Sequence, residues 1–266
     1  QEVLDIKTKI NDPEKPVSLP ATTAHSLDFE HVDYRYQSAE QLALSDIDFS
    51  AHSGQTVAII GGTGSGKTTL VNLMPRFYDI ESGQVKLDGQ DIRNLKTADL
   101  HRAISFVPQT ATLFTGTIRD NMKFGNDNAT DDEIWHALEI ARSTDFVKEE
   151  GGLDAHVEQG GGNFSGGQRQ RLAIARALVK KASVYVFDDS FSALDFKTDA
   201  QLRAELRQDA QVQQGVVVIV AQRIATVADA DLILVLDNGK LVGKGTHAEF
   251  KANNEVYQEI MKSQLR

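Results

Sequence analysis

The chain has no cysteine among its 266 residues, which excludes disulfide bonds, catalytic thiolates and cysteine-ligated metal sites. It also has no apolar run of the roughly 20 residues that a helix needs to cross a bilayer. No signal peptide is visible, since the chain starts with the polar string QEVLD. Because the chain also begins without Met, we expect a processed protein or a piece cut from a longer one.

Basic residues are scarcer than acidic ones. The chain has 28 Lys and Arg against 38 Asp and Glu, a formal net charge of −10 and a pI of about 5.2. Proteins that bind nucleic acid need a basic face to neutralise phosphates, so we expect no nucleic-acid partner. With 41% hydrophobic residues, the chain is long enough for one large domain, or for one domain with a subdomain.

The first part of the chain differs in composition from the rest. Residues 1–24 carry three of the five prolines, Pro13, Pro16 and Pro20, and show little periodicity. We therefore expect a linker at 1–24 and a folded domain at 25–266. Apolar and polar residues alternate from 27 to 36 and again after residue 41, which predicts a β-rich region at the start of this domain.

The middle of the chain is expected to be helical. A capping box at residues 130–133 opens one helix, and a second helix, rich in Arg, Ala and Leu, covers 168–179. The segment 144–157 between them is mixed and loop-rich. We therefore expect an inserted α-helical subdomain at about 112–180. After this subdomain the pattern predicts strands at 183–187, 216–220 and 232–236 and a helix at 197–209.

The string GGTGSGKT at residues 61–68 is a complete phosphate-binding loop. An apolar run precedes it and a helical pattern follows it, and this strand–loop–helix order is the context that gives the motif its meaning. Backbone N–H groups of the loop can wrap a phosphate chain, the Lys67 ammonium can reach the β- and γ-phosphates, and the Thr68 hydroxyl can ligate Mg²⁺. We expect ATP to be bound by Gly61, Gly62, Thr63, Gly64, Ser65, Gly66, Lys67, Thr68 and Thr69.

Two further motifs suit the same ligand. Four apolar residues at 184–187 lead into Asp188, a carboxylate at the end of a predicted strand that can hold Mg²⁺ through water. The string NFSGGQ at 163–168 comes directly before a predicted helix, where Ser165 can cap the helix and the glycines permit close approach of a ligand. The N–H groups at that helix start form a potential anion site.

Together these motifs resemble the nucleotide-binding domain of an ATP-binding cassette (ABC) transporter, from about residue 27 to the C-terminus. Smaller motifs agree in order and spacing. Tyr36 resembles the aromatic residue that stacks on adenine, Gln109 the Q-loop glutamine that touches Mg²⁺, and Asp195 the aspartate of the D-loop. The segments 157–160 and 113–121 resemble motifs of the exporter branch. Each also has a simpler interpretation, as core packing, a surface amide or a helix cap.

The resemblance implies an α/β fold, namely a P-loop ATPase core with a mixed sheet, an antiparallel β subdomain and an inserted α-helical subdomain. It implies ATP and Mg²⁺ as cofactors, with the metal held by Thr68, Gln109 and Asp188. Two such domains pair head to tail, so the partner is a second nucleotide-binding domain. The signature residues that would serve the partner's nucleotide are Asn163, Phe164, Ser165, Gly166, Gly167 and Gln168.

The resemblance also implies a location. In the exporter branch the motor domain follows a transmembrane domain of the same polypeptide, so the proline-containing linker 1–24 suits a tether from that domain. We therefore expect the domain to lie at the cytoplasmic face of the cell membrane.

Two positions depart from the family pattern. Fully active members have Glu directly after the Mg²⁺ aspartate and a switch His after the next strand, whereas this chain has Asp189 and Gln222. A misplaced or missing general base lowers a rate by about 10²–10⁴. With Lys67, these residues are expected to govern hydrolysis, and the pattern resembles the degenerate-site half of a heterodimeric ABC exporter. Neutral drift with activity retained is the alternative, because Asp is still a carboxylate.

Two other classes of function remain open at this stage. One is a soluble, non-transport ABC ATPase that acts on DNA or ribosomes. Such a protein would need a basic surface or long coiled-coil inserts. The other is a module that senses nucleotide without significant hydrolysis, which Asp189 and Gln222 favour.

Overall fold

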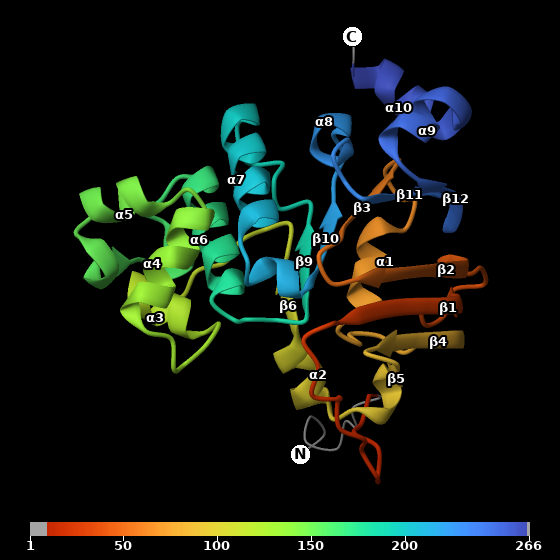
Figure 1. Cartoon of the computed structure of the whole chain (residues 1–266), viewed down its shortest axis with the longest axis horizontal. Helices are drawn as coiled ribbons and strands as arrows, with labels where there is room; N and C mark the ends of the chain where they lie inside the picture. Colours follow the sequence, from red (N-terminus) through yellow and green to blue (C-terminus); the bar gives the residue numbers. More distant parts are fainter. Residues whose placement is uncertain (1–9, 265–266) are drawn as a thin grey trace.

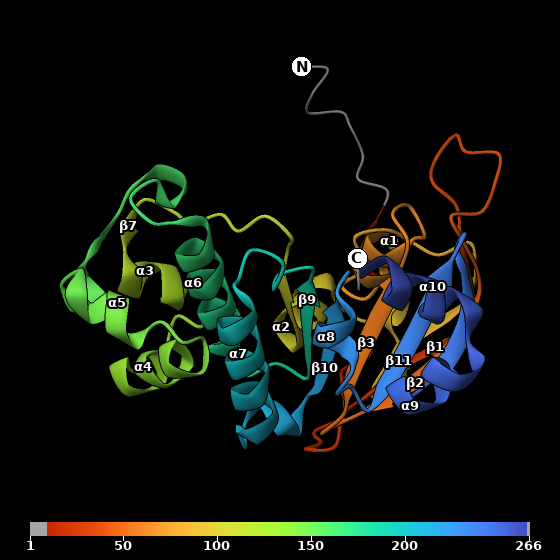
Figure 2. The same ribbon diagram turned by 90° about the horizontal axis from the view of Figure 1, so that it is seen from above.

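The computed structural model describes residues 10–264, so the first nine residues of the predicted linker lie outside the described part of the chain. Figures 1 and 2 show two lobes, a larger one that contains the sheets and a smaller helical one. Ahead of the first strand, Val17 forms an isolated parallel bridge with Leu95. Over residues 10–264, no helix is long and apolar enough to cross a bilayer.

A six-stranded mixed sheet forms the centre of the larger lobe, in the order β12-β11-β3-β10-β9-β6. The run Thr56–Gly61 forms β3, and every residue in it is buried, as expected for a parallel strand covered on both faces. The strands pair in parallel, except that β12 is antiparallel to β11. The other strands of this sheet are β6 Ile104–Val107, β9 Val184–Asp188, β10 Val216–Val220, β11 Leu232–Asp237 and β12 Lys240–Gly245.

A second, antiparallel sheet has the order β2-β1-β4-β5. Its strands are β1 Ser26–Tyr34, β2 Leu44–His52, β4 Ser82–Leu87 and β5 Gln90–Asp91. Apolar residues on one face of this sheet share a core with β3 and with helix α1, Lys67–Leu73, which directly follows the phosphate-binding loop. The loop is therefore held between two sheets that bury the elements on either side of it.

The helical lobe contains α3 Ile118–Lys123, α4 Asp131–Ile140, α5 Thr144–Glu149 and α6 Gly166–Leu178, with a two-stranded ribbon of β7 Gly116–Thr117 and β8 His156–Val157 (Figure 1). The predicted capping box opens α4, as expected. The segment 144–157 is more ordered than its composition predicts, because Phe146 and Val147 of α5 are buried against the lobe. The burial of these two side chains depends on tertiary contacts, which a local sequence pattern does not predict.

The remaining helices are α2 Thr97–Ala103, α7 Phe196–Gln208, α8 Ile224–Val227, α9 His247–Asn253 and α10 Glu255–Gln264, with short 3₁₀ turns at Ile92–Asn94, Gly152–Asp154, Gln159–Gly161 and Val212–Gln214. In both views α7 lies between the helical lobe and the central sheet. The predicted fold class, an α/β core with a mixed sheet, an antiparallel sheet and a helical insertion, is confirmed.

Candidate functional site

The phosphate-binding loop joins β3 to α1 in a backbone conformation that requires glycine. Gly66 has a φ of 105°, in the left-handed region that other residues rarely adopt. At Gly61 a Cβ atom would lie 2.1 Å from the Leu236 carbonyl oxygen, so no side chain fits there. Gly62, Thr63 and Gly64 are exposed, which leaves the outer face of the loop open to a ligand.

Lys67 folds back over the loop from the first turn of α1. Its Nζ donates hydrogen bonds to the carbonyl oxygens of Gly61 and Gly62, both at 2.8 Å. Burial lowers the pKa of Lys67, and the nearby carboxylates of Asp189 and Asp188 oppose that effect. The ammonium group thus lies between the glycine loop and two carboxylates.

Ser65 is the most enclosed side chain of the loop. Its Oγ is buried and, within residues 10–264, has no hydrogen-bond partner. A buried hydroxyl without a partner costs free energy, so its persistence in a loop of this kind needs an explanation. A phosphate oxygen in the loop is the partner that the surrounding N–H groups would also bind.

Asp188 reaches the loop from the end of β9. Its Oδ1 accepts a hydrogen bond from Thr68 Oγ1 at 3.3 Å, and the residue is only 4% exposed. Burial raises the pKa of Asp188; the Thr68 hydrogen bond opposes this and the neighbouring Asp189 carboxylate adds to it. Residues 120 positions apart in the sequence therefore place two side-chain oxygen atoms 3.3 Å from each other.

We expect Asp188→Asn to raise the free energy of unfolding of the nucleotide-free chain at pH 7 by about 1 kcal/mol, because it removes a buried charge next to another carboxylate. The pKa of Asp188 is raised above its ordinary value of 3.8, so the wild-type chain loses stability as the pH rises through the folded-state pKa. The gain from Asn should therefore be full at pH 7 and vanish as the pH falls towards 3.8. Urea unfolding across this pH range measures it.

The control for this prediction is Asp127→Asn, which removes an exposed carboxylate of the helical lobe. It should leave the unfolding midpoint unchanged. A clear loss of stability in Asp188→Asn at pH 7 would contradict the prediction, since it would mean that the ionised carboxylate stabilises the empty site.

Asp189 is held by two amides that come from distant segments. Gln109 Nε2 and Gln222 Nε2 both donate to Asp189 Oδ2, at 3.1 and 2.8 Å. Asp189 has a φ of 50°, an uncommon value for a residue with a side chain. Burial raises the pKa of Asp189, and the hydrogen bond from Gln222 is the largest opposing effect. Gln109, predicted to touch Mg²⁺, contacts Asp189 here, and no hydrogen bond joins it to Thr68 or Asp188 within residues 10–264.

Tyr36, predicted to stack on adenine, lies beside the first turn of α1, directly after the phosphate-binding loop. It is 40% exposed, and its hydroxyl is 2.7 Å from Thr69 Oγ1 in α1. Its ring makes edge contacts with Tyr34 and Tyr78, at centroid distances of 5.0 and 5.7 Å. The sequence analysis missed Tyr78, because no spacing connects it with Tyr36.

The signature segment begins α6 in the helical lobe. Ser165 is the N-cap of this helix, as predicted, and it also exchanges hydrogen bonds with Gln168 in a capping box. Gly166 is exposed, whereas Phe164 is buried, and the Asn163 side chain ties the segment to β8. Within residues 10–264, no hydrogen bond connects residues 163–168, including Gly167, to the phosphate-binding loop.

Asp195 caps α7 by accepting hydrogen bonds from the Thr198 backbone at 3.0 Å and from its hydroxyl at 2.7 Å. The simpler interpretation of Asp195, a helix cap, thus describes its side chain. Arg223, a residue that the sequence analysis did not single out, reaches the same segment and donates to the Ser192 carbonyl oxygen at 2.8 Å. It links the segment after β10 to the segment before α7.

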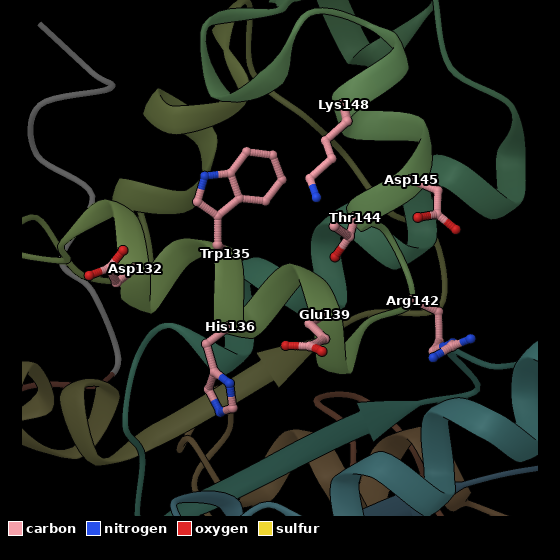
Figure 3. Close-up of a pocket in the computed structure, with 8 residues that line it drawn as sticks. All are labelled: Asp132, Trp135, His136, Glu139, Arg142, Thr144, Asp145 and Lys148. Atoms are coloured by element: carbon pink, nitrogen blue, oxygen red, sulfur yellow. The ribbon is translucent and has the colours of Figure 1, made fainter.

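A large cavity lies away from this site, between α4 and α5 (Figure 3). It has a volume of about 800 Å³ and mixes acidic and basic side chains. Trp135 packs against the core of the helical lobe, and the Lys148 ammonium is 5.8 Å from the centre of its ring. None of the predicted nucleotide-binding residues lines this cavity, so it does not compete with the glycine loop as the nucleotide site.

The fold and the site define a P-loop nucleotide-binding protein: a glycine loop between a buried strand and a helix, with a carboxylate at the end of a neighbouring strand. A profile of the ABC transporter family matches residues 44–192. The chain belongs to the ABC transporter family and is an ATP-binding domain of that family.

Known relatives agree with this assignment. An uncharacterized ABC transporter ATP-binding protein of Mycobacterium tuberculosis is 44% identical over 266 residues, which cover 99% of this chain and 45% of the relative. The β-(1→2)glucan export ATP-binding/permease protein of Bartonella bacilliformis is 38% identical over 99% of this chain and 44% of its own length. The chain thus spans less than half of the curated relatives it matches.

A solved structure supports the same family. The structure of a bacterial Atm1-family ABC exporter with ATP bound is similar to the whole of this chain, with a TM-score of 0.92 and 34% sequence identity. The match covers 46% of that exporter chain. The predicted family and fold class are therefore confirmed.

Proposed function

We propose that this chain is the motor domain of an ABC exporter, which binds Mg²⁺ and ATP in a head-to-tail dimer with a second nucleotide-binding domain. Its own site hydrolyses ATP slowly, and its signature segment completes the competent site of a different partner chain. The observation that carries the proposal is the double hydrogen bond to Asp189, because Gln109 and Gln222 both donate to the carboxylate that stands in the position of the general base.

The residues around the loop fit a magnesium–nucleotide complex. Thr68 and Asp188 offer two hard oxygen ligands 3.3 Å apart, which is the donor chemistry that Mg²⁺ takes. Gln109 would have to leave Asp189 to join them. The loop residues 61–69 would hold the phosphates, and Tyr36 would stack on the base.

The slow site follows from the state of Asp189. A general base needs a free lone pair directed at the attacking water, and the two amides already occupy Oδ2 of Asp189. Asp is also one methylene shorter than the Glu of active family members. Gln222 can donate a hydrogen bond to a phosphate but cannot act as an imidazole.

The domain layout proposed here follows the relatives. Residues 1–24 form a linker from a transmembrane domain of the same polypeptide, residues 25–266 form the nucleotide-binding domain, and the helical subdomain covers about 112–180. Relatives named as export ATP-binding/permease proteins, of which this chain covers 44%, support this layout. The domain would then lie at the cytoplasmic face of the membrane.

A second candidate function is nucleotide sensing without significant hydrolysis, and the two amides on Asp189 favour it. The two proposals differ in what the partner does. A motor domain supports turnover at the partner's site, whereas a sensor pairs with the partner in an ATP-dependent manner and leaves turnover unchanged. Dimerisation and hydrolysis therefore have to be measured separately.

The test mixes this chain with a partner domain that carries Glu and His at the two diverged positions. We expect the partner's turnover to fall about tenfold when Ser165 of this chain is replaced by Arg, because the bulky cation blocks the helix start that would face the partner's nucleotide. ATP binding to this chain's own loop should not change, since Ser165 has no hydrogen bond to the loop.

The matched control is Ser263→Arg in the same mixture, which places the same cation at an exposed position on α10. It should leave the partner's turnover intact. Fast ATP hydrolysis by this chain alone, abolished by Asp189→Asn, would overturn the slow-site proposal. Unchanged partner turnover in Ser165→Arg would favour the sensor.

A further inference from the structure

The last residue that the structure describes reaches back to the segment that carries Gln222. Gln264, at the end of α10, donates from Nε2 to the Gln222 carbonyl oxygen at 2.6 Å. Its Oε1 accepts from the Ile224 backbone N–H at 2.9 Å. One side-chain amide thus bridges the two peptide groups on either side of Arg223, at the point where the chain leaves β10 and enters α8.

The helix that carries Gln264 is fixed independently of this bridge. Tyr257 of α10 is fully buried, and its hydroxyl is 2.7 Å from His247 Nδ1. The Tyr257 backbone N–H donates to the Asn254 side chain at 2.8 Å. Figures 1 and 2 both show α10 next to α8. Because the contacts of Tyr257 fix α10 independently, Gln264 can restrain the position of residues 222–224.

The opposite side of the segment is fixed as well. The Arg223 guanidinium donates to the Ser192 carbonyl oxygen at 2.8 Å and lies 4.8 Å from the centre of the Phe196 ring. Residues 222–224 are therefore clamped between α10 and the segment before α7. The Gln222 side chain, which donates to Asp189 Oδ2 at 2.8 Å, thus extends from a backbone segment that has contacts on both sides.

We propose that Gln264 is a positioning residue for ATP hydrolysis, which orients Gln222 through the backbone of residues 222–224. The proposal rests on the proposed function, in which the Gln222 amide donates to a phosphate of the bound nucleotide. It makes the C-terminal helix a part of the hydrolytic site, although Gln264 itself touches neither the glycine loop nor Asp189 through any hydrogen bond recorded for residues 10–264.

The experiment replaces Gln264 by Met, which keeps the length of the side chain and removes both hydrogen bonds. In the 266-residue chain we expect the single-turnover rate of ATP hydrolysis to fall about fivefold, because the two hydrogen bonds that hold residues 222–224 are lost. ATP affinity should be unchanged. The melting temperature should be unchanged as well, since both hydrogen bonds are exposed to solvent. The matched control is Gln258→Met on the same helix, which removes an amide that donates to the Lys251 carbonyl oxygen, and its rate should equal that of the parent.

A double-mutant cycle separates positioning from a general structural effect. In a Gln222→Ala background, Gln264→Met should cause no further loss, because the side chain that it orients is absent. The same fivefold loss in that background, a loss in Gln258→Met, or a weaker ATP affinity without a change in rate would each overturn the proposal.

The failure of this proposal can be told apart from a failure of the slow-site proposal. The ratio of the Gln264→Met rate to the parent rate tests Gln264 and is measured in the wild-type chain and in Asp189→Glu/Gln222→His. The parent rates alone test the slow site. If the wild-type parent hydrolyses ATP fast and Gln264→Met still lowers that rate about fivefold, the slow-site proposal is contradicted and the positioning role is supported.

Discussion

The double variant Asp189→Glu/Gln222→His is expected to hydrolyse ATP about 100-fold faster than the wild-type chain, because a correctly placed general base contributes about 10²–10⁴ to a rate. In the wild type, both amides donate to a single oxygen of Asp189, and Asp is one methylene shorter than the Glu of the family pattern. The longer Glu extends towards the attacking water, and His replaces one of the two amide donors. Steady-state phosphate release measures the effect.

The two single variants are the controls. Asp189→Glu alone should gain less than the pair, since Gln222 can still donate to the carboxylate, and Gln222→His alone leaves the short side chain in place. ATP affinity should be the same in all four chains, because the glycine loop, Lys67 and Asp188 are untouched. An unchanged rate in the double variant would show that these two positions do not limit hydrolysis.

Lys67→Ala is expected to weaken ATP binding about 100-fold, because it removes a charge-assisted contact to the phosphates that is worth about 2–3 kcal/mol. Within the described chain, Lys67 is the cation that the loop itself positions, with two hydrogen bonds to loop carbonyls. Titration of the chain with ATP, followed by fluorescence or calorimetry, gives the dissociation constant.

The matched control is Lys86→Ala, in which the lost ammonium pairs with Glu30 on the antiparallel sheet, at 2.8 Å. This variant should bind ATP as the wild type does. Thermal unfolding without nucleotide checks that Lys67→Ala still folds; burial lowers the pKa of Lys67, so loss of that charge does not itself destabilise the empty chain. Unaltered affinity in Lys67→Ala would remove the basis for every role assigned to the loop.

Features that depend on neighbouring residues in the sequence could be predicted from it. The glycine loop at 61–68, the apolar run into Asp188 and the helix cap at Ser165 are all contiguous, and their spacing determines their local structure. The order of these motifs also indicated the family, and with it the mixed and antiparallel sheets. The strand β12 was not predicted, because residues 240–245 form an edge strand with two glycines and little hydrophobic alternation.

Features that depend on distant residues could not be predicted. The sequence identified Asp189, Gln109 and Gln222 separately, but nothing in their spacing indicates that both amides donate to the same oxygen. The same holds for Gln264, whose partner is 42 positions away, and for Arg223, whose partner is 31 positions away. Such contacts follow from the packing of whole helices, which no local pattern records.

The fold of Lys67 over its own loop has a consequence for how readily the empty site accepts a ligand. The ammonium group already has carbonyl partners at 2.8 Å, so a lysine that would otherwise sample many rotamers is held near one geometry. Ordering such a side chain carries an entropic cost of about 2 kcal/mol. Here that ordering takes place during folding, and an arriving polyphosphate exchanges one set of oxygen atoms for another around a cation that is already in place.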